Sequence, residues 1–169
     1  MENLIGLKGL MKKLKVDVED IAMIMENQDR FGNQYYLDTE TGETVAIPDE
    51  LMIALEEGES CEGLPAWELK LLPLAKEIFE GNNRYEEIPV RPSYDGYNLM
   101  VQFSEGVSNK RIQRELSIAL DGRGAFRRFK NVLMEYPEVE KQWFQFKAER
   151  DKEEVKDWLE SIGIEMKEE

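Results

Sequence analysis

Basic side chains gather in one short stretch of a strongly acidic protein. The chain has 169 residues, of which 22 are Lys or Arg, 36 are Asp or Glu and none is His, so its net charge is −14. Within residues 109–130, seven basic residues stand against Glu115 and Asp121, which gives this stretch +5 and leaves −19 for the rest. The seven are Lys110, Arg111, Arg114, Arg123, Arg127, Arg128 and Lys130. Such a concentration of cations predicts either ion pairs with the chain's own carboxylates or a site for an external anion.

The second half of this stretch has the features of an anion site. Gly122 and Gly124 flank Arg123 just before an expected helix, and glycine permits left-handed turns that point successive N–H groups at one position. Cations in a first helical turn are unfavourable unless an anion compensates them. The candidate anion-binding or partner-binding residues are Gly122, Arg123, Gly124, Arg127, Arg128 and Lys130. The simpler interpretation, which we favour, is internal pairing with the acid-rich final helices, although exposed pairs contribute only about 0–1 kcal/mol each.

The same stretch has the outline of a helix-turn-helix, with a short glycine turn between two expected helices. In a DNA-reading helix the first turn contacts bases, and Arg127 and Arg128 are of a suitable type for this. An ordinary corner between two helices has the same outline. Because the remaining chain carries −19, its approach to a phosphate backbone is opposed. Nucleic-acid binding is therefore an alternative that the net charge disfavours.

The sequence offers no catalytic motif. Without His, the chain lacks Ser-His-Asp and Cys-His triads and has no imidazole metal ligand. The single cysteine, Cys61, excludes an internal disulfide and a Cys-rich metal site. Adjacent acids such as Glu56 and Glu57 point about 100° apart on a helix, so they do not form a catalytic pair. We expect no catalytic residue, no metal and no cofactor, and a carboxylate-dependent enzyme remains a second alternative.

Turn and cap residues predict a small sheet in the first half of the chain. Asp17 is an expected N-cap for a helix over residues 18–27. Two β-prone runs around a polar turn in residues 34–47 predict a β-hairpin. Residues 84–90 predict a third strand in an edge position, because Pro89 cannot donate a hydrogen bond to a neighbouring strand.

The second half of the chain is expected to be helical. Ser93 and Ser108 are expected N-caps of two helices, and a third helix is expected over residues 125–136. Residues 137–163 form either one long helix or two that meet near Asp151. An aromatic stripe is expected in the core, namely Phe126, Phe129, Trp143, Phe146 and Trp158. These elements predict an α+β fold in which a small antiparallel sheet, with its hairpin near the N-terminal third, packs on a mainly helical C-terminal half.

The last third of the chain carries a recognisable order of residues. It reads Gly-Arg-Gly-Ala-Phe-Arg-Arg-Phe-Lys at 122–130, then Tyr-Pro-Glu at 136–138, then Trp-Leu-Glu-Ser-Ile-Gly-Ile-Glu at 158–165. This order resembles Uncharacterised Protein Family 0158, a set of bacterial proteins with no established function, and the likeness covers residues 14–165. The resemblance implies a single α+β domain. It implies no activity, cofactor or catalytic residue, because the family has none to transfer.

We therefore expect one domain over residues 14–165, preceded by an extension over residues 1–13 in which Met11 is an alternative start to Met1. No apolar run approaches the roughly 18 residues that span a membrane, and the N-terminus lacks the order of a signal peptide, so a cytoplasmic protein is expected. The leading hypothesis is a non-enzymatic protein–protein interaction or regulatory module of the bacterial cytosol whose protein partner is unidentified. The alternatives are nucleic-acid binding through residues 109–130 and a carboxylate-dependent enzyme.

Overall fold

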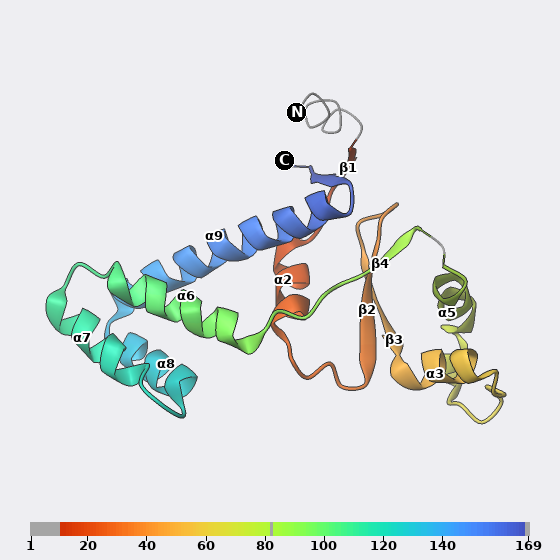
Figure 1. Ribbon diagram of the computed structural model, residues 1–169, viewed down its shortest axis with the longest axis horizontal. Helices are drawn as coiled ribbons and strands as arrows, with labels where there is room; N and C mark the ends of the chain where they lie inside the picture. Colours follow the sequence, from red (N-terminus) through yellow and green to blue (C-terminus); the bar gives the residue numbers. More distant parts are fainter. Residues whose placement is uncertain (1–10, 82, 168–169) are drawn as a thin grey trace. The chain divides into compact units, whose positions relative to one another are not determined.

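The computed structural model describes residues 11–81 and 83–167, which divide into two compact units (Figure 1). Unit 1 combines the chain up to Val90 with the chain from Glu154, and unit 2 comprises Arg91–Glu153. Unit 2 is thus inserted into the sequence of unit 1. Each unit has its own cluster of buried apolar side chains. That residues 14–165 form a single domain remains a prediction, because the division into two compact units does not test it.

The sheet of unit 1 contains the predicted hairpin. Strand β2 (Asn33–Asp38) pairs antiparallel with β3 (Thr44–Pro48), and Tyr36 faces Val45. Strand β4 (Tyr85–Glu87) pairs antiparallel with the other side of β2, so the order is β3-β2-β4 (Figure 1). The hairpin and the edge position of the third strand are confirmed. The strand is shorter than expected, although the Ile88 N–H still donates to the Tyr35 carbonyl over 2.8 Å.

Several helices of unit 1 accompany this sheet. Helix α2 (Val18–Glu26) begins where predicted, because the Asp17 carboxylate accepts a hydrogen bond from the Asp20 N–H over 3.1 Å. Helix α3 follows β3 directly, and α4 and α5 come before β4. Their bounds are Asp49–Glu57, Ala66–Leu69 and Leu72–Phe79, respectively. Side chains from the sheet, α3 and α5 meet in one buried cluster, which contains Tyr36, Ile47, Leu51 and Ala75.

Two further strands of unit 1 were missed by the sequence analysis. Strand β1 (Lys12–Leu14) and strand β5 (Ile164–Met166) pair in parallel. Leu14 and Ile164 are buried with α2 and the C-terminal end of α9. A three-residue strand shows no alternation in the sequence, and its partner lies at the other end of the chain. The pairing begins before the expected boundary at residue 14, whereas residues 1–10 of the expected extension lie outside the described residues.

Unit 2 is helical throughout its regular elements. Helices α6 (Ser93–Glu105), α7 (Lys110–Ala119) and α8 (Ala125–Glu135) precede α9 (Pro137–Ser161), which continues into unit 1. Helix α9 is unbroken at Asp151, which settles the alternative between one helix and two. The core is built on aromatic rings: Trp143 lies 5.0 Å from Phe129 and 5.3 Å from Phe103 between ring centroids, both in edge-to-face contact.

Three expectations about these helices were wrong. Ser93 is the first residue of α6 and makes no capping hydrogen bond, and Asn109 rather than Ser108 caps α7 by accepting from the Arg111 and Ile112 N–H groups. Phe126 is 47% exposed rather than in the core. Helix α8 buries a set of residues spaced by four, and Phe126 lies one residue after the first of them, about 100° away around the helix. The buried set is Ala125, Phe129 and Leu133.

A buried ion pair connects the two ends of unit 2. The Arg91 guanidinium and the Asp151 carboxylate lie 2.9 Å apart, and both side chains are largely shielded from solvent. The Lys147 ammonium lies 2.9 Å from the second carboxylate oxygen of Asp151. Two cations therefore compensate one carboxylate in a place where an unpaired charge would be costly.

A second ion pair lies at the edge of the sheet in unit 1. The buried Asp38 carboxylate accepts two hydrogen bonds from Arg84, 2.9 Å from Nε and 2.8 Å from Nη2. These bonds to the guanidinium hold the pKa of Asp38 at about 2, below its ordinary value. Asp38 is the last residue of β2, so the pair ties the hairpin to the segment that enters β4.

We expect Asp38→Asn to lower the free energy of unfolding at neutral pH by about 1–2 kcal/mol, because the charge-assisted bonds to Arg84 weaken. The pKa of Asp38 is lower in the folded than in the unfolded chain, where it is about 3.9. The stabilisation is therefore complete above pH 4 and is lost as the pH falls toward 2. Urea unfolding at a series of pH values measures this difference between the two proteins. Glu40→Gln is the control, because exposed Glu40 faces the same arginine. Equal stability of Asp38→Asn and the unaltered protein at every pH would contradict the prediction.

Candidate functional site

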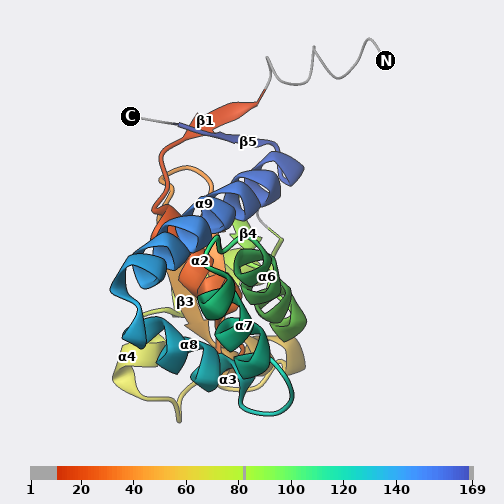
Figure 2. The ribbon, with the colours of Figure 1, turned by 90° about the vertical axis from the view of Figure 1, so that its left-hand side faces the viewer.

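The basic stretch forms a corner between two neighbouring helices of unit 2. Helices α7 and α8 lie side by side in both views (Figures 1 and 2), and residues 120–124 connect them. Gly122 and Gly124 have φ angles of 79° and 77°, in the left-handed region that glycine adopts without strain. A Cβ atom on Gly124 would also lie 3.2 Å from a guanidinium nitrogen of Arg128. The corner therefore has a defined turn that glycine permits.

Arg128 donates hydrogen bonds to three backbone carbonyls of this corner. Its Nε donates to the Ala119 carbonyl over 3.0 Å, and its two terminal nitrogens donate to the carbonyls of Asp121 and Arg123. The last carbonyls of a helix have no intrahelical N–H partner, so the guanidinium satisfies the end of α7 and the turn after it. Arg128 thus has a structural role that neither of the sequence-based interpretations included. Its donors point at backbone carbonyls of its own corner.

The other candidate cations face solvent. Arg123, Arg127 and Lys130 are exposed, and among residues 11–81 and 83–167 their side chains form no hydrogen bond or ion pair. Arg111 lies 3.5 Å from Glu115 in the next turn of α7, which is an exposed pair of small energetic value. Glu115 also accepts a 2.6 Å hydrogen bond from the Tyr136 hydroxyl, and this bond raises the pKa of Tyr136.

The two most exposed apolar side chains of unit 2 accompany these cations. Ile118 is 67% exposed on α7 and Met134 is 70% exposed on α8. On each helix, two cations and one apolar residue follow one another at positions i, i+3 and i+7. This spacing places the three side chains on the face away from the buried side of the helix. The two stripes are Arg111, Arg114 and Ile118 on α7, and Arg127, Lys130 and Met134 on α8. We call the side chains of Arg114, Ile118, Arg127, Lys130 and Met134 the basic corner surface.

The apolar half of this surface was not predicted from the sequence. Ile118 and Met134 stand on the polar side of their helices, away from the buried side. An apolar residue on the polar side of an amphipathic helix was the available signal. Single exposed apolar residues are common, so only their position beside unpaired cations makes these two informative.

Charge is distributed unequally between the two units. Unit 2 has 12 Lys and Arg residues against 10 Asp and Glu residues, a net charge of +2. The whole chain has a net charge of −14, so unit 1, which is the rest of the chain, has a net charge of −16. The acidity of this protein is a property of unit 1, and the basic corner surface belongs to the unit with a small positive charge.

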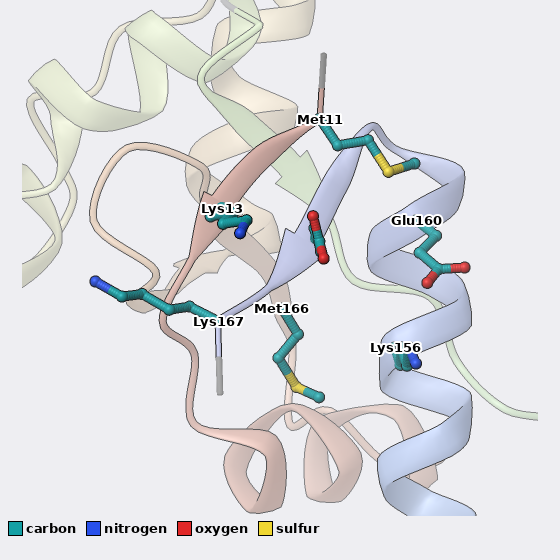
Figure 3. Close-up of a pocket in the computed structure, with 7 residues that line it drawn as sticks. Met11, Lys13, Lys156, Glu160, Met166 and Lys167 are labelled. Atoms are coloured by element: carbon teal, nitrogen blue, oxygen red, sulfur yellow. The ribbon is translucent and has the colours of Figure 1, made fainter. Parts of the chain in front are cut away.

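A pocket of about 520 Å³ lies over β1, β5 and the end of α9 in unit 1 (Figure 3). Three lysines and two glutamates surround it together with two methionines, so its charges largely compensate one another. The lining residues are Met11, Lys13, Lys156, Glu160, Glu165, Met166 and Lys167. Lys13 and Glu165 are register partners on β1 and β5, so these two opposite charges lie on neighbouring strands.

The described residues contain neither a metal-binding cluster nor a helix that could span a membrane. In residues 11–81 and 83–167, no group of three or more His, Cys, Asp or Glu side chains is placed to hold a metal ion. No helix in the described part of the chain has the length and apolar character needed to cross a membrane.

Replacing Arg128 tests its structural role. We expect Arg128→Met to lower the free energy of unfolding by about 1–3 kcal/mol, because three carbonyls lose their donor. Arg127→Met is the matched control on the next residue, and we expect it to change stability by less than about 0.5 kcal/mol. Chemical denaturation followed by tryptophan fluorescence measures both. If the two variants are equally stable, Arg128 does not hold the corner.

Comparison with known proteins bears out the resemblance in the last third of the chain. The uncharacterised protein family UPF0158 matches residues 11–169. The UPF0158 protein PA5073 of Pseudomonas aeruginosa is 28% identical over 158 residues, which cover 91% of this chain and 87% of that protein. No solved structure matches the chain. The chain therefore belongs to the uncharacterised protein family UPF0158.

Proposed function

We propose that this protein is a non-enzymatic protein–protein interaction module of the bacterial cytosol and that its partner binds the basic corner surface. The observation that supports the proposal is the presence of unpaired cations beside exposed apolar side chains on one rigid corner. Arg127 and Lys130 have no partner in the described parts of the chain, and Met134 is exposed one turn further along α8.

The composition of the surface favours a protein as its ligand. Arginine and methionine are enriched in protein interfaces, where apolar contacts supply the affinity and charge sets the choice of partner. The cations favour acidic side chains on the partner, and Ile118 and Met134 favour apolar ones. An acidic protein segment with apolar side chains on one face has both properties.

The hydrogen bonds of Arg128 also support this proposal, because they order the corner before a partner binds. They hold the end of α7 against the start of α8, so the two stripes of side chains are presented in a fixed relation. A surface that is ordered before binding loses less conformational entropy when its partner arrives.

Site-specific photocrosslinking in cells tests the proposal. A benzophenone amino acid at position 118 or 134 is expected to form a crosslink to a protein, and one at exposed position 142 on α9 is not. Arg127→Glu should abolish the crosslink because it reverses a charge at the centre of the surface. Lys141→Glu changes the net charge equally at an exposed position of α9 and should leave it unchanged. Absence of a crosslink at both positions, or a crosslink insensitive to Arg127→Glu, would contradict the proposal.

A nucleic acid is the second candidate ligand, and the exposure of Arg127, Lys130 and Asn131 on one side of α8 favours it. These residue types contact phosphates and base edges, and α8 follows a helix and a turn as a DNA-reading helix does. The charge of −16 on unit 1 opposes it.

Fluorescence anisotropy with a labelled DNA duplex at low salt separates the two candidates. The protein-partner proposal predicts no saturable binding. Saturable binding that is lost in Arg127→Glu and kept in Lys141→Glu would instead favour the nucleic acid, because both variants change the net charge by the same amount.

A further inference from the structure

One turn of unit 1 exposes an aromatic side chain whose backbone has a conformation that aromatic residues disfavour. Phe31, between α2 and β2, is 76% exposed. Its φ is +52°, in the left-handed region that bulky side chains disfavour. A residue in this conformation persists only where its surroundings impose it, and such positions concentrate at sites of function.

Side chains of the turn impose this conformation. Asn27 accepts a hydrogen bond from the Asp29 N–H, and Asp29 accepts one from the Phe31 N–H over 3.0 Å. The Asn33 side-chain amide donates to the carbonyls of Arg30 and Phe31 over 3.2 Å each. The backbone around Phe31 is therefore held from both sides.

The Arg30 side chain connects the turn to other elements of unit 1. Its two terminal nitrogens donate to the carbonyls of Ile88 and Ile24 over 2.8 and 3.2 Å, and its guanidinium lies 5.6 Å from the centre of the Tyr35 ring. Arg30 thus connects the turn with α2, β2 and the segment after β4. Phe31 projects from a rigid base.

Acidic residues lie close to Phe31 along the backbone. Asp29 lies in the turn itself, and the Asp49 N–H donates to the Gly32 carbonyl over 2.7 Å, which brings the acidic start of α3 beside the turn. Glu50 is the next residue and is exposed. We call Asp29, Phe31, Asp49 and Glu50 the Phe31 turn surface, which combines one exposed aromatic ring with three neighbouring acidic residues.

We infer that the Phe31 turn surface of one molecule binds the basic corner surface of a second copy of this chain. The inference rests on the proposed function, since it identifies the protein that the corner binds. An exposed aromatic ring with acidic residues in its neighbourhood complements exposed apolar side chains that accompany unpaired cations. In the described residues both halves of this contact are present, on units that carry −16 and +2.

Sedimentation velocity of the purified full chain tests the inference. We expect the weight-average mass to exceed that of a monomer at low salt, to rise with protein concentration, and to fall to the monomer value as salt approaches about 1 M, where the Debye length is about 3 Å. Phe31→Asn should weaken association by about tenfold or more, as expected for a central aromatic anchor. Phe79→Asn alters another exposed aromatic residue of unit 1 and should have no effect.

The stability of Phe31→Asn is a second readout. Asparagine tolerates the left-handed region better than phenylalanine does, so the urea midpoint of this variant should equal or exceed that of the unaltered chain. Loss of association together with an undiminished midpoint shows that Phe31 serves binding rather than folding. A lowered midpoint with unchanged association would overturn the inference.

A charge exchange tests the contact itself. Glu50→Arg and Arg127→Glu should each be monomeric alone, because each places like charges at the contact. An equimolar mixture of the two should associate again, because an arginine then faces a glutamate in one contact and the original residues remain in the other. A chain that is monomeric at every concentration, or a mixture that does not associate, overturns the inference. Crosslinks from positions 118 and 134 to a different protein would then leave the proposed function standing, and their absence would remove both.

Discussion

The buried ion pair between Arg91 and Asp151 is the interaction on which the helical unit depends. Arg91 is the first residue of unit 2, and Asp151 lies two residues before its last, so the pair joins the two ends of the inserted chain. Lys147 adds a second cation to the same carboxylate. Because breaking a buried ion pair is costly, the contact holds the start of unit 2 against α9. The aromatic contacts of Phe103 and Phe129 with Trp143 then form the core on which α7 and α8 pack.

Two consecutive arginines show how the position of a residue on a helix decides which groups its side chain contacts. Arg127 and Arg128 have the same side chain and neighbouring places on α8, yet Arg128 donates to three carbonyls and Arg127 has no partner in the described residues. A step of about 100° around the helix turns one guanidinium toward the end of α7 and the other toward solvent. The basic corner surface thus arises from what the fold leaves unpaired. The outward Phe31 ring of unit 1 arises from the opposite cause, a set of hydrogen bonds that forces exposure.

Local signals predicted much of the fold and only part of the site. The Asp17 cap, the hairpin around its polar turn and the glycine break at residues 122–124 depend on neighbouring residues, so they were readable from the sequence. The β1–β5 pairing depends on residues at opposite ends of the chain and was missed. The expected pairing of the arginines with acidic final helices relied on composition, which does not state which carboxylate comes within reach. The exposed Ile118 and Met134 were also overlooked, although an apolar residue on the polar side of an amphipathic helix was a signal for each.

By itself, the sequence determined which chemistry this protein lacks and where its positive charge is concentrated. The absence of His and the single Cys exclude the triads and metal sites that require them, and the run of cations at residues 109–130 can be counted in the chain. Only the tertiary structure decided which of those cations have hydrogen-bond or ion-pair partners in the described residues. It also decided that the negative charge is concentrated in unit 1. The physical reason is that composition is additive along a chain, whereas a hydrogen bond needs a donor and an acceptor within about 3 Å of each other. Folding alone brings the Arg128 guanidinium to the carbonyl of Ala119 and leaves Arg127 facing solvent.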